Sequence, residues 1–297
     1  MMRQVLVVVG PTATGKSEAG IAVAQRFGGE VVNADSMQLY RGMNIGTAKL
    51  MAAEQQGVPH HLLDVWDVTQ PASVAEYQRI AREVFDKLHA NGRVPVLVGG
   101  SGLYIRRALD DFDFPGTDAE VRAGLEMDLQ RDGTDALHRR LVDVDPEAAA
   151  EILPSNGRRL VRALEVVALT GRKFSTRPGM KAYQALYEVQ LVGIDPELGQ
   201  LDERIAQRVD DMLARGLVAE VRALERVGLR RGRTAKQALG YQQILAMLAG
   251  TLAESDVRNE IVHATRRFAR RQLSWFRRDP RVTWVPKPGD VVAAFHE

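Results

Sequence analysis

The stretch of sequence that decides the fold is QVLVVVGPTATGKS, residues 4–17. Its apolar, mostly β-branched start predicts a parallel strand from Gln4 to Val9 that is buried on both faces. A glycine, four further residues and the triplet GKS follow, which is the pattern of a phosphate-binding loop (P-loop). The helical spacing from Lys16 to Phe27 completes the strand, turn and helix that this motif requires. We therefore expect phosphate to be bound by Gly10, Pro11, Thr12, Ala13, Thr14, Gly15, Lys16 and Ser17.

The chemistry of this turn explains its residue types. Glycines let backbone N–H groups converge on phosphate oxygens, and the following helix directs its positive end to the same place. Lys16 supplies a mobile positive charge, and Ser17 supplies a hydroxyl for Mg²⁺. The pattern leaves open whether the phosphates belong to a nucleotide such as ATP.

Strand and helix signals alternate over the first hundred residues. A second strand is predicted at residues 30–34 and a third at 94–98. Between them, Ser73 and Glu76 form a capping box ahead of an amphipathic helix. This alternation predicts an α/β fold, namely a P-loop NTPase-like parallel sheet flanked by helices and joined by right-handed crossovers.

The pattern changes at about residue 113, where helical signals follow one another without a strand. They cover residues 118–131, 134–141, 145–153 and 156–169. Strand character returns at residues 187–194. We therefore predict a P-loop core in two parts, residues 1–112 and 185–297, that carries an all-helical insertion at 113–184 and ends with a basic helix.

Composition bounds the class of protein. The chain has 297 residues, 45% hydrophobic and 26% charged, which is enough for a sizeable core and excludes disorder as the default state. It has no cysteine, which excludes disulfides, zinc fingers, iron–sulfur clusters and thiol nucleophiles. The apolar run near the start is far too short to span a membrane. We expect a soluble, cytoplasmic, monomeric protein without a membrane partner.

Charge is unevenly distributed although the net charge is only +2. Residues 258–281 hold eight arginines against two acidic residues. Two explanations fit this composition equally well. One is an arginine-rich genome, and the other is a need for guanidinium groups that bind phosphate. Three basic helix faces in an otherwise acidic chain favour a polyanion too large for one pocket. These faces hold Arg158, Arg159 and Arg162; Arg204 and Arg208; and Arg266, Arg267, Arg270 and Arg271.

Two polar segments follow predicted strands at their carboxyl ends, where ligands bind in open α/β sheets. Asp35 begins the run DSMQ, and its carboxylate can hold Mg²⁺, accept a proton or cap the next helix. Ser101 lies within GGSG at 99–102, which indicates either a close approach to a ligand or a tight turn. The pair His60-His61 is a weak metal candidate, because adjacent histidines point in different directions.

Taken together, these motifs resemble the tRNA dimethylallyltransferase (tRNA isopentenyltransferase) family. The matching segments are GPTATGKS at 10–17, DSMQ at 35–38, GTAK at 46–49, PHHLLD at 59–64, GGSGLY at 99–104, RALEV at 162–166, TG at 170–171, ALGY at 238–241 and residues 265–276. The ordered set is highly specific, whereas a P-loop alone is shared by many families. The chain departs from the usual family spelling at Leu50, Ser101, Gly157 and Gln243, although Ser101 keeps a hydroxyl.

The resemblance implies a reaction. The diphosphate of dimethylallyl diphosphate lies on the P-loop with Mg²⁺, and the N6 amine of the adenosine 3′-adjacent to the anticodon attacks the allylic carbon. Asp35 acts as general base, and Ser101 and Arg208 steady the diphosphate and its bridging oxygen. Arg208 is preferred to Arg204 on the spacing within the arginine helix.

The resemblance also implies that the tRNA anticodon stem-loop is the partner. A base in a stacked loop has to be flipped out to reach a pocket. The flipped base would contact Asp35, Ser36, Met37, Gln38 and Ser101. The helical insertion would clasp the stem-loop with Arg122, Arg158, Arg159 and Arg162, and the basic helix at 266–278 would lie against the nucleic acid or line the channel.

Three other functions compete with this one. A P-loop small-molecule kinase shares the core and the phosphate loop, but it needs nucleotide turnover and no separate basic face. A non-catalytic, nucleotide-gated RNA-binding protein would make Asp35 dispensable. An enzyme that prenylates free adenine nucleotides would need neither the insertion nor the basic helix.

Overall fold

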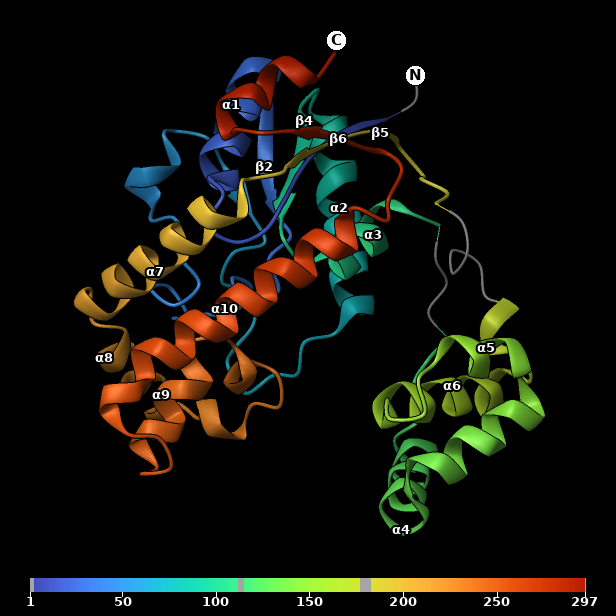
Figure 1. Ribbon diagram of the computed structural model, residues 1–297. Coiled ribbons are helices and arrows are strands. Elements are labelled where there is room, and N and C mark those ends of the chain that lie inside the picture. The colour runs from blue at the N-terminus through green and yellow to red at the C-terminus, as the bar shows by residue number, and fades with distance from the viewer. Residues whose placement is uncertain (1–2, 112–114, 177–182, 297) are drawn as a thin grey trace. The chain divides into compact units, whose positions relative to one another are not determined.

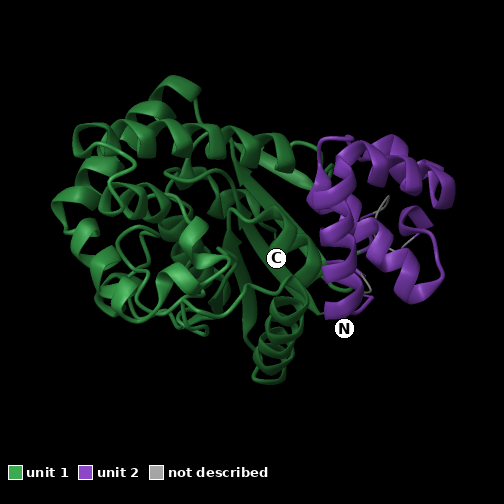
Figure 2. Cartoon of the chain, turned by 90° about the horizontal axis from the view of Figure 1, so that it is seen from below, with its two compact units in different colours: residues 1–109, 185–297 green, residues 110–184 purple. Residues whose placement is uncertain are grey.

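The computed structural model describes residues 3–111, 115–176 and 183–296. The chain forms two compact units, one made of Met1–Leu109 and Ala185–Glu297 and the other of Asp110–Gln184 (Figure 2). The segments that lead into and out of the second unit are paired by backbone hydrogen bonds. Leu186 N–H donates to the Leu109 carbonyl at 2.9 Å, and Asp111 N–H donates to the Gln184 carbonyl at 2.7 Å.

A six-stranded, all-parallel sheet forms the centre of the first unit, in the order β3-β2-β4-β1-β5-β6 (Figure 1). The strands are β1 Gln4–Val9, β2 Gly29–Asn33, β3 His60–His61, β4 Val94–Gly99, β5 Glu188–Ile194 and β6 Val282–Val285. The predicted parallel α/β sheet is confirmed. The sequence did not predict β3 and β6, because an edge strand of two or four residues is too short to show a pattern.

β1 explains why the sheet is buried on both faces. It lies between β4 and β5, and residues 5–9 have no exposed surface. Alternate side chains enter different cores: Val5 and Val7 join the core under α2, α3 and α7–α10, while Leu6 and Val8 join the core under α1 and the C-terminal segment. The sheet is thus covered by helices on both faces, as the continuous apolar run predicts.

The helices of this unit position the loops at the carboxyl ends of the strands. They are α1 Lys16–Phe27, α2 Val74–Ala90, α3 Gly102–Leu109, α7 Leu198–Ala214, α8 Leu217–Arg226, α9 Tyr241–Leu248 and α10 Glu254–Phe276. Short 3₁₀ helices occupy Ala52–Gln55, Leu229–Arg231, Ala235–Gln237, Pro288–Asp290 and Val292–Ala294. No helix in the described part of the chain is both long and apolar enough to cross a bilayer.

The second unit contains helices and no strand among its described residues. They are α4 Ala119–Val144, α5 Pro146–Glu151, α6 Gly157–Thr170 and a 3₁₀ turn at Phe174–Thr176. Gly133 has non-helical angles, φ 80° and ψ 175°, so α4 bends where the sequence predicts a break between two helices. The core of the second unit is built on Leu137, Leu141 and Leu160, which have no exposed surface.

Gly20 sets how closely α1 lies on β4. A Cβ atom at this position would come within 2.5 Å of the Val98 Cγ2 atom. We expect Gly20→Ala to lower the free energy of unfolding by about 1–3 kcal/mol, because overpacking outweighs the better helix propensity of alanine. Urea unfolding followed by circular dichroism measures the change.

Gly124→Ala is the matched control, because a Cβ at Gly124 in α4 meets no atom within 4 Å. This variant should gain about 0.5–1 kcal/mol from helix propensity alone. An equal gain for Gly20→Ala would contradict the close packing of α1 on the sheet.

Candidate active site

The P-loop turn joins β1 to α1. Positive φ angles at Gly10 (146°), Ala13 (63°) and Gly15 (80°) fold the backbone into a tight cradle, with Gly15 at the start of the helix. The Lys16 ammonium donates to the Pro11 carbonyl at 2.5 Å, so its side chain folds back over the turn. The P-loop residues therefore lie in the strand–turn–helix context that the motif requires.

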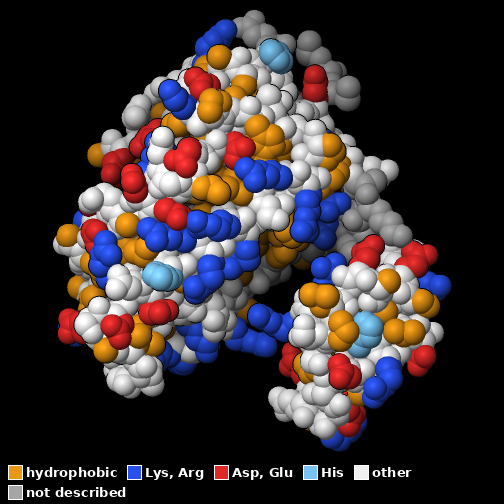
Figure 3. All heavy atoms as spheres, viewed as in Figure 1, with side chains coloured by type: hydrophobic (Ala, Val, Ile, Leu, Met, Phe, Trp, Pro, Cys, Tyr) orange, Lys and Arg blue, Asp and Glu red, His pale blue; other side chains and the backbone are white. Residues whose placement is uncertain are grey.

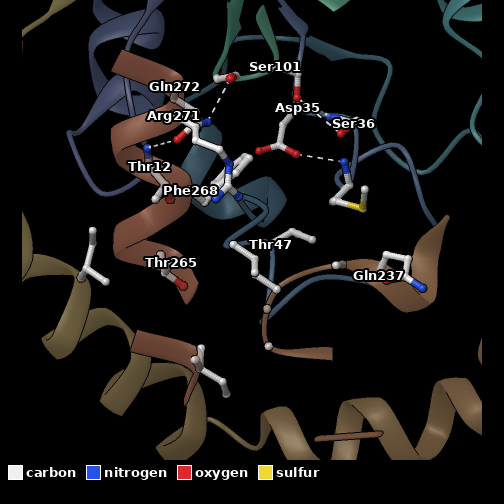
Figure 4. A pocket seen from close by; sticks show the side chains of 18 of the residues that line it. Thr12, Asp35, Ser36, Thr47, Ser101, Gln237, Thr265, Phe268, Arg271 and Gln272 are labelled. Carbon is white, nitrogen blue, oxygen red and sulfur yellow. Dashed lines mark hydrogen bonds between the residues drawn. The ribbon is translucent and has the colours of Figure 1, made fainter. Parts of the chain in front are cut away.

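A buried glutamine of α10 ties this turn to the turn after β4. Thr12 N–H donates to Gln272 Oε1 at 3.0 Å, and Gln272 Nε2 donates to the Gly100 carbonyl at 2.9 Å (Figure 4). A Cβ at Gly100 would lie 2.1 Å from Nε2, so only glycine allows this approach. Sequence analysis did not single out Gln272; the one available signal was an uncharged polar residue at a core position of the basic helix.

Asp35 and Ser101 lie on neighbouring loops at the carboxyl ends of β2 and β4. The Asp35 N–H donates to Asn33 Oδ1 at 2.9 Å, and Asp35 Oδ1 accepts the Met37 N–H at 2.9 Å. Ser101 Oγ accepts the Ser36 N–H at 3.2 Å, which connects the two loops. Figure 4 shows Asp35 facing the same space as Gln272 and Ser101. The carboxylate is thus fixed by its own turn rather than used as a helix cap.

Arg208 of α7 completes a group of three charges with Lys16 and Asp35. Burial and the Arg208 guanidinium lower the pKa of Lys16 to about 7, against the attraction of Asp35. Burial also lowers the pKa of Arg208, again against the attraction of Asp35. Arg204, one turn earlier, is exposed and lines neither of the two pockets at this site. An anion bound beside Arg208 would favour the protonated form of Lys16, so that two cations would then face the anion and one carboxylate.

Two adjoining pockets meet at this charge group. The smaller one, about 100 Å³, includes Lys16 and Ser17 in its walls. The larger one, about 620 Å³, extends away from the P-loop between α7, α10 and residues 237–242. Residues that line both are Thr12, Asp35, Thr47, Gly100, Arg208, Phe268 and Gln272. Asp35 and Arg208 therefore stand between the pocket at the P-loop and a largely apolar cavity.

The other residues of the DSMQ segment divide between these pockets. Ser36 and Met37 line the larger cavity, together with Ser101. Gln38 lines the smaller pocket, and its Nε2 donates to the Thr47 carbonyl at 3.0 Å. Its amide nitrogen is therefore engaged within the protein, where sequence analysis assigned Gln38 to nucleic-acid contact.

The arginines predicted in the helical unit have different surroundings. Arg122 and Arg162 pair with the fully buried Glu165 at 2.6 and 2.7 Å. Arg162 also donates to the carbonyl of Pro115 at 2.8 Å. Arg158 and Arg159 are exposed. The first pair holds its own unit together, and the second pair is open to solvent.

The basic helix is partly neutralised by acids that sequence analysis did not place opposite it. Arg266 and Arg270 pair with Asp202 of α7, and Arg258 pairs with Asp210 at 2.6 Å. Figure 3 shows basic side chains on the face that carries α7 and α10, with acidic ones among them. Arg271 lines the larger cavity, so part of this helix faces the site.

The donor set at the P-loop is suited to a metal that binds through oxygen. Ser17 and Asp35 both line the smaller pocket, and magnesium in phosphate sites takes one or two protein oxygens together with phosphate oxygens. No cluster of three or more His, Cys, Asp or Glu side chains occurs in the described ranges 3–111, 115–176 and 183–296. His61 Nε2 contacts Glu30 at 2.6 Å, whereas His60 Nδ1 contacts the Val58 carbonyl.

Comparisons with known proteins match most of the chain to one family. Residues 38–279 match the family model described as IPP transferase. A tRNA dimethylallyltransferase of Streptomyces griseus is 61% identical over 282 residues, covering 95% of this chain and 90% of the relative. A tRNA dimethylallyltransferase of Salinispora arenicola is 60% identical, covering 98% and 84%.

Solved structures agree with the sequence relatives. The full-length tRNA isopentenylpyrophosphate transferase of Bacillus halodurans is 39% identical with a TM-score of 0.71, covering 96% of this chain and 90% of that one. A eukaryotic dimethylallyltransferase acting on tRNA is 27% identical with a TM-score of 0.80, covering 92% and 70%.

The bridge made by Gln272 generates a prediction about anion binding. Gln272→Glu keeps the shape but loses the donor to Gly100 and adds a negative charge beside Thr12. We expect inorganic diphosphate to bind at least about tenfold more weakly, because like charges in a desolvated site repel. Isothermal titration calorimetry measures the affinity.

Ser274→Glu is the control, since it adds the same charge at an exposed position of the same helix. It should leave diphosphate affinity within about twofold, because exposed charges are screened. Unchanged affinity in Gln272→Glu would show that the Gln272 side chain does not influence anion binding.

Proposed function

The chain belongs to the IPP transferase family, and from that premise we propose that it prenylates tRNA. It transfers the dimethylallyl group of dimethylallyl diphosphate to N6 of the adenosine 3′-adjacent to the anticodon, releasing diphosphate. The observation that supports this most is the position of Asp35 and Arg208 between the P-loop pocket and a cavity of about 620 Å³. That volume lies within the usual range for ligand pockets.

The P-loop side would hold the leaving group. As the allylic C–O bond breaks, negative charge builds up on the diphosphate, and backbone N–H groups of the P-loop, Lys16 and Arg208 would stabilise it. Ser101 would hydrogen-bond the same group. Ser17 would hold Mg²⁺, which when bound supplies further positive charge to the diphosphate oxygens.

The cavity side would hold the nucleophile. The adenosine N6 attacks the allylic carbon, a C–N bond forms, and the N6 proton passes to the Asp35 carboxylate. An exocyclic aromatic amine is a weak nucleophile, so orientation contributes more than basicity. The Met37 N–H bond to Asp35 Oδ1 fixes the carboxylate in one orientation.

Recognition of tRNA would use both units. The adenosine has to leave the stacked loop to reach Asp35, and Ser36 and Met37 line the cavity that would receive it. Arg158 and Arg159 would contact the phosphate backbone, since both are exposed. Arg122 and Arg162 would order the same helices through Glu165.

The cellular setting follows from the substrate. We place the enzyme in the cytoplasm, where tRNA is modified, and propose that it acts as a monomer. The kinase alternative is not favoured, since the relatives and solved structures are tRNA-modifying transferases.

The direct test combines radiolabelled dimethylallyl diphosphate with unmodified tRNA, with and without ATP. We expect label in tRNA without any ATP requirement, located at N6 by mass spectrometry of nucleosides. Phosphorylation of a small molecule with no labelled tRNA would overturn the proposal in favour of a kinase.

Asp35→Asn tests the general base. It keeps the shape of the side chain but cannot take the N6 proton, so kcat should fall by about 10²- to 10⁴-fold. Binding of tRNA, measured by filter binding, should stay within about threefold, since phosphate contacts dominate the affinity. Retained turnover would show that Asp35 is not the base.

Arg208→Ala and Arg204→Ala form a matched pair on one helix. Removal of the Arg208 charge from the leaving group should lower kcat by about 10²- to 10³-fold. Arg204 is exposed, and its removal should change kcat by less than about twofold. Steady-state transfer assays compare the two, and equal effects would contradict the assignment of Arg208.

A further inference from the structure

Glu220 of α8 holds a turn on the wall of the active site. Its carboxylate accepts three successive backbone N–H groups, from Asn44 at 3.1 Å, Ile45 at 2.8 Å and Gly46 at 3.3 Å. It also accepts the Tyr241 hydroxyl at 2.5 Å. Consecutive N–H groups that converge on an anion make a strong, directional interaction, so one side chain fixes the whole turn.

Tyr241 closes the same turn from the other side. A Cβ at Gly46 would lie 2.4 Å from the Tyr241 Cε2 atom, so the ring packs directly on the glycine backbone. Tyr241 has no exposed surface, and burial together with the Glu220 carboxylate raises its pKa. Its hydroxyl therefore stays protonated and remains a donor to Glu220.

The Thr47 carbonyl connects the turn at residues 44–46 to the segment that begins with Asp35. Thr47 follows the turn, and its carbonyl accepts Gln38 Nε2 at 3.0 Å and, more weakly, Arg208 Nη2 at 3.5 Å. Gln38 ends the segment that begins at Asp35. Thr47 also lines both pockets, whereas Glu220 lines neither.

We propose that Glu220 is a positioning residue for the transfer reaction. It holds residues 44–46 so that the Thr47 carbonyl fixes Gln38, and with it the turn that carries the Asp35 carboxylate, relative to the P-loop. This inference rests on the proposed function. Glu220 lies three residues after Leu217 and four before Leu224, so it shares the inward face of α8 with these core residues. On that face its carboxylate binds the backbone N–H groups of residues 44–46 and the Tyr241 hydroxyl.

Glu220→Gln tests the proposal in the full chain. An amide offers one oxygen to three N–H groups and turns its own N–H₂ toward other donors, so the turn should shift. We expect kcat to fall by about 10- to 100-fold, because small misplacements of a catalytic group are costly. The KM for dimethylallyl diphosphate should change by less than about threefold, since the P-loop is intact.

Two further variants separate positioning from stability. Val221→Ala, on the same helix and fully buried, should lower the melting temperature with little change in kcat. Gln38→Met breaks the connection at Thr47. If Glu220 acts through the Gln38–Thr47 hydrogen bond, the double variant Gln38→Met/Glu220→Gln should have a kcat less than about threefold below that of Gln38→Met alone.

Each outcome bears on one claim. Loss of kcat in Glu220→Gln that disappears in the Gln38→Met background supports positioning, whereas the same fold-loss in both backgrounds, or no loss, overturns it. If Glu220→Gln does not fold, Tyr241→Phe removes one donor and leaves the ring, and should lower kcat by about three- to tenfold; unchanged kcat there overturns the proposal. If the unaltered chain transfers no dimethylallyl group, the proposed function itself fails.

Discussion

The active site depends on one buried side-chain amide. The side-chain oxygen of Gln272 accepts the Thr12 N–H, and its nitrogen donates to the Gly100 carbonyl. The amide thereby joins the P-loop, the turn after β4 and helix α10. Backbone groups in such turns have no partners within a strand or helix, and leaving them buried without one is unfavourable. With the amide in place, two glycine-rich turns and the long C-terminal helix become one rigid surface around a shared cavity.

The charges of Lys16, Arg208 and Asp35 distinguish the P-loop end of this cavity from its apolar end. Burial first, and the nearby Arg208 guanidinium second, lower the pKa of Lys16 to about 7. The attraction of Asp35 offsets only part of this lowering. Such a site is preorganised for an anion, whose arrival relieves the repulsion between the cations. The carboxylate marks where the anion site ends and the apolar cavity begins.

Local sequence patterns predicted the strands, turns and helices that form from neighbouring residues of the chain. The run at residues 4–17 was enough to place β1, the turn and α1, and the ends of β2 and β4 placed Asp35 and Ser101 at one edge. The roles of these residues stay predictions. Contacts between distant segments could not be inferred: Gln272, Glu220 and the acids that pair with Arg258 and Arg270 lie far along the chain from the groups they bind. Composition therefore did not reveal that arginines of the basic helix are paired with acids.

The two segments that lead into and out of the helical unit are paired, so the unit could be removed by protein engineering. Leu109 and Leu186 are hydrogen-bonded neighbours, so the chain leaves and rejoins the first unit at nearly the same point. A few flexible residues between them would span the gap in place of 110–184, leaving every strand of the sheet in the remaining polypeptide. A chain shortened in this way would keep every residue that lines the two pockets, so it separates the contribution of the helical unit from that of the site itself.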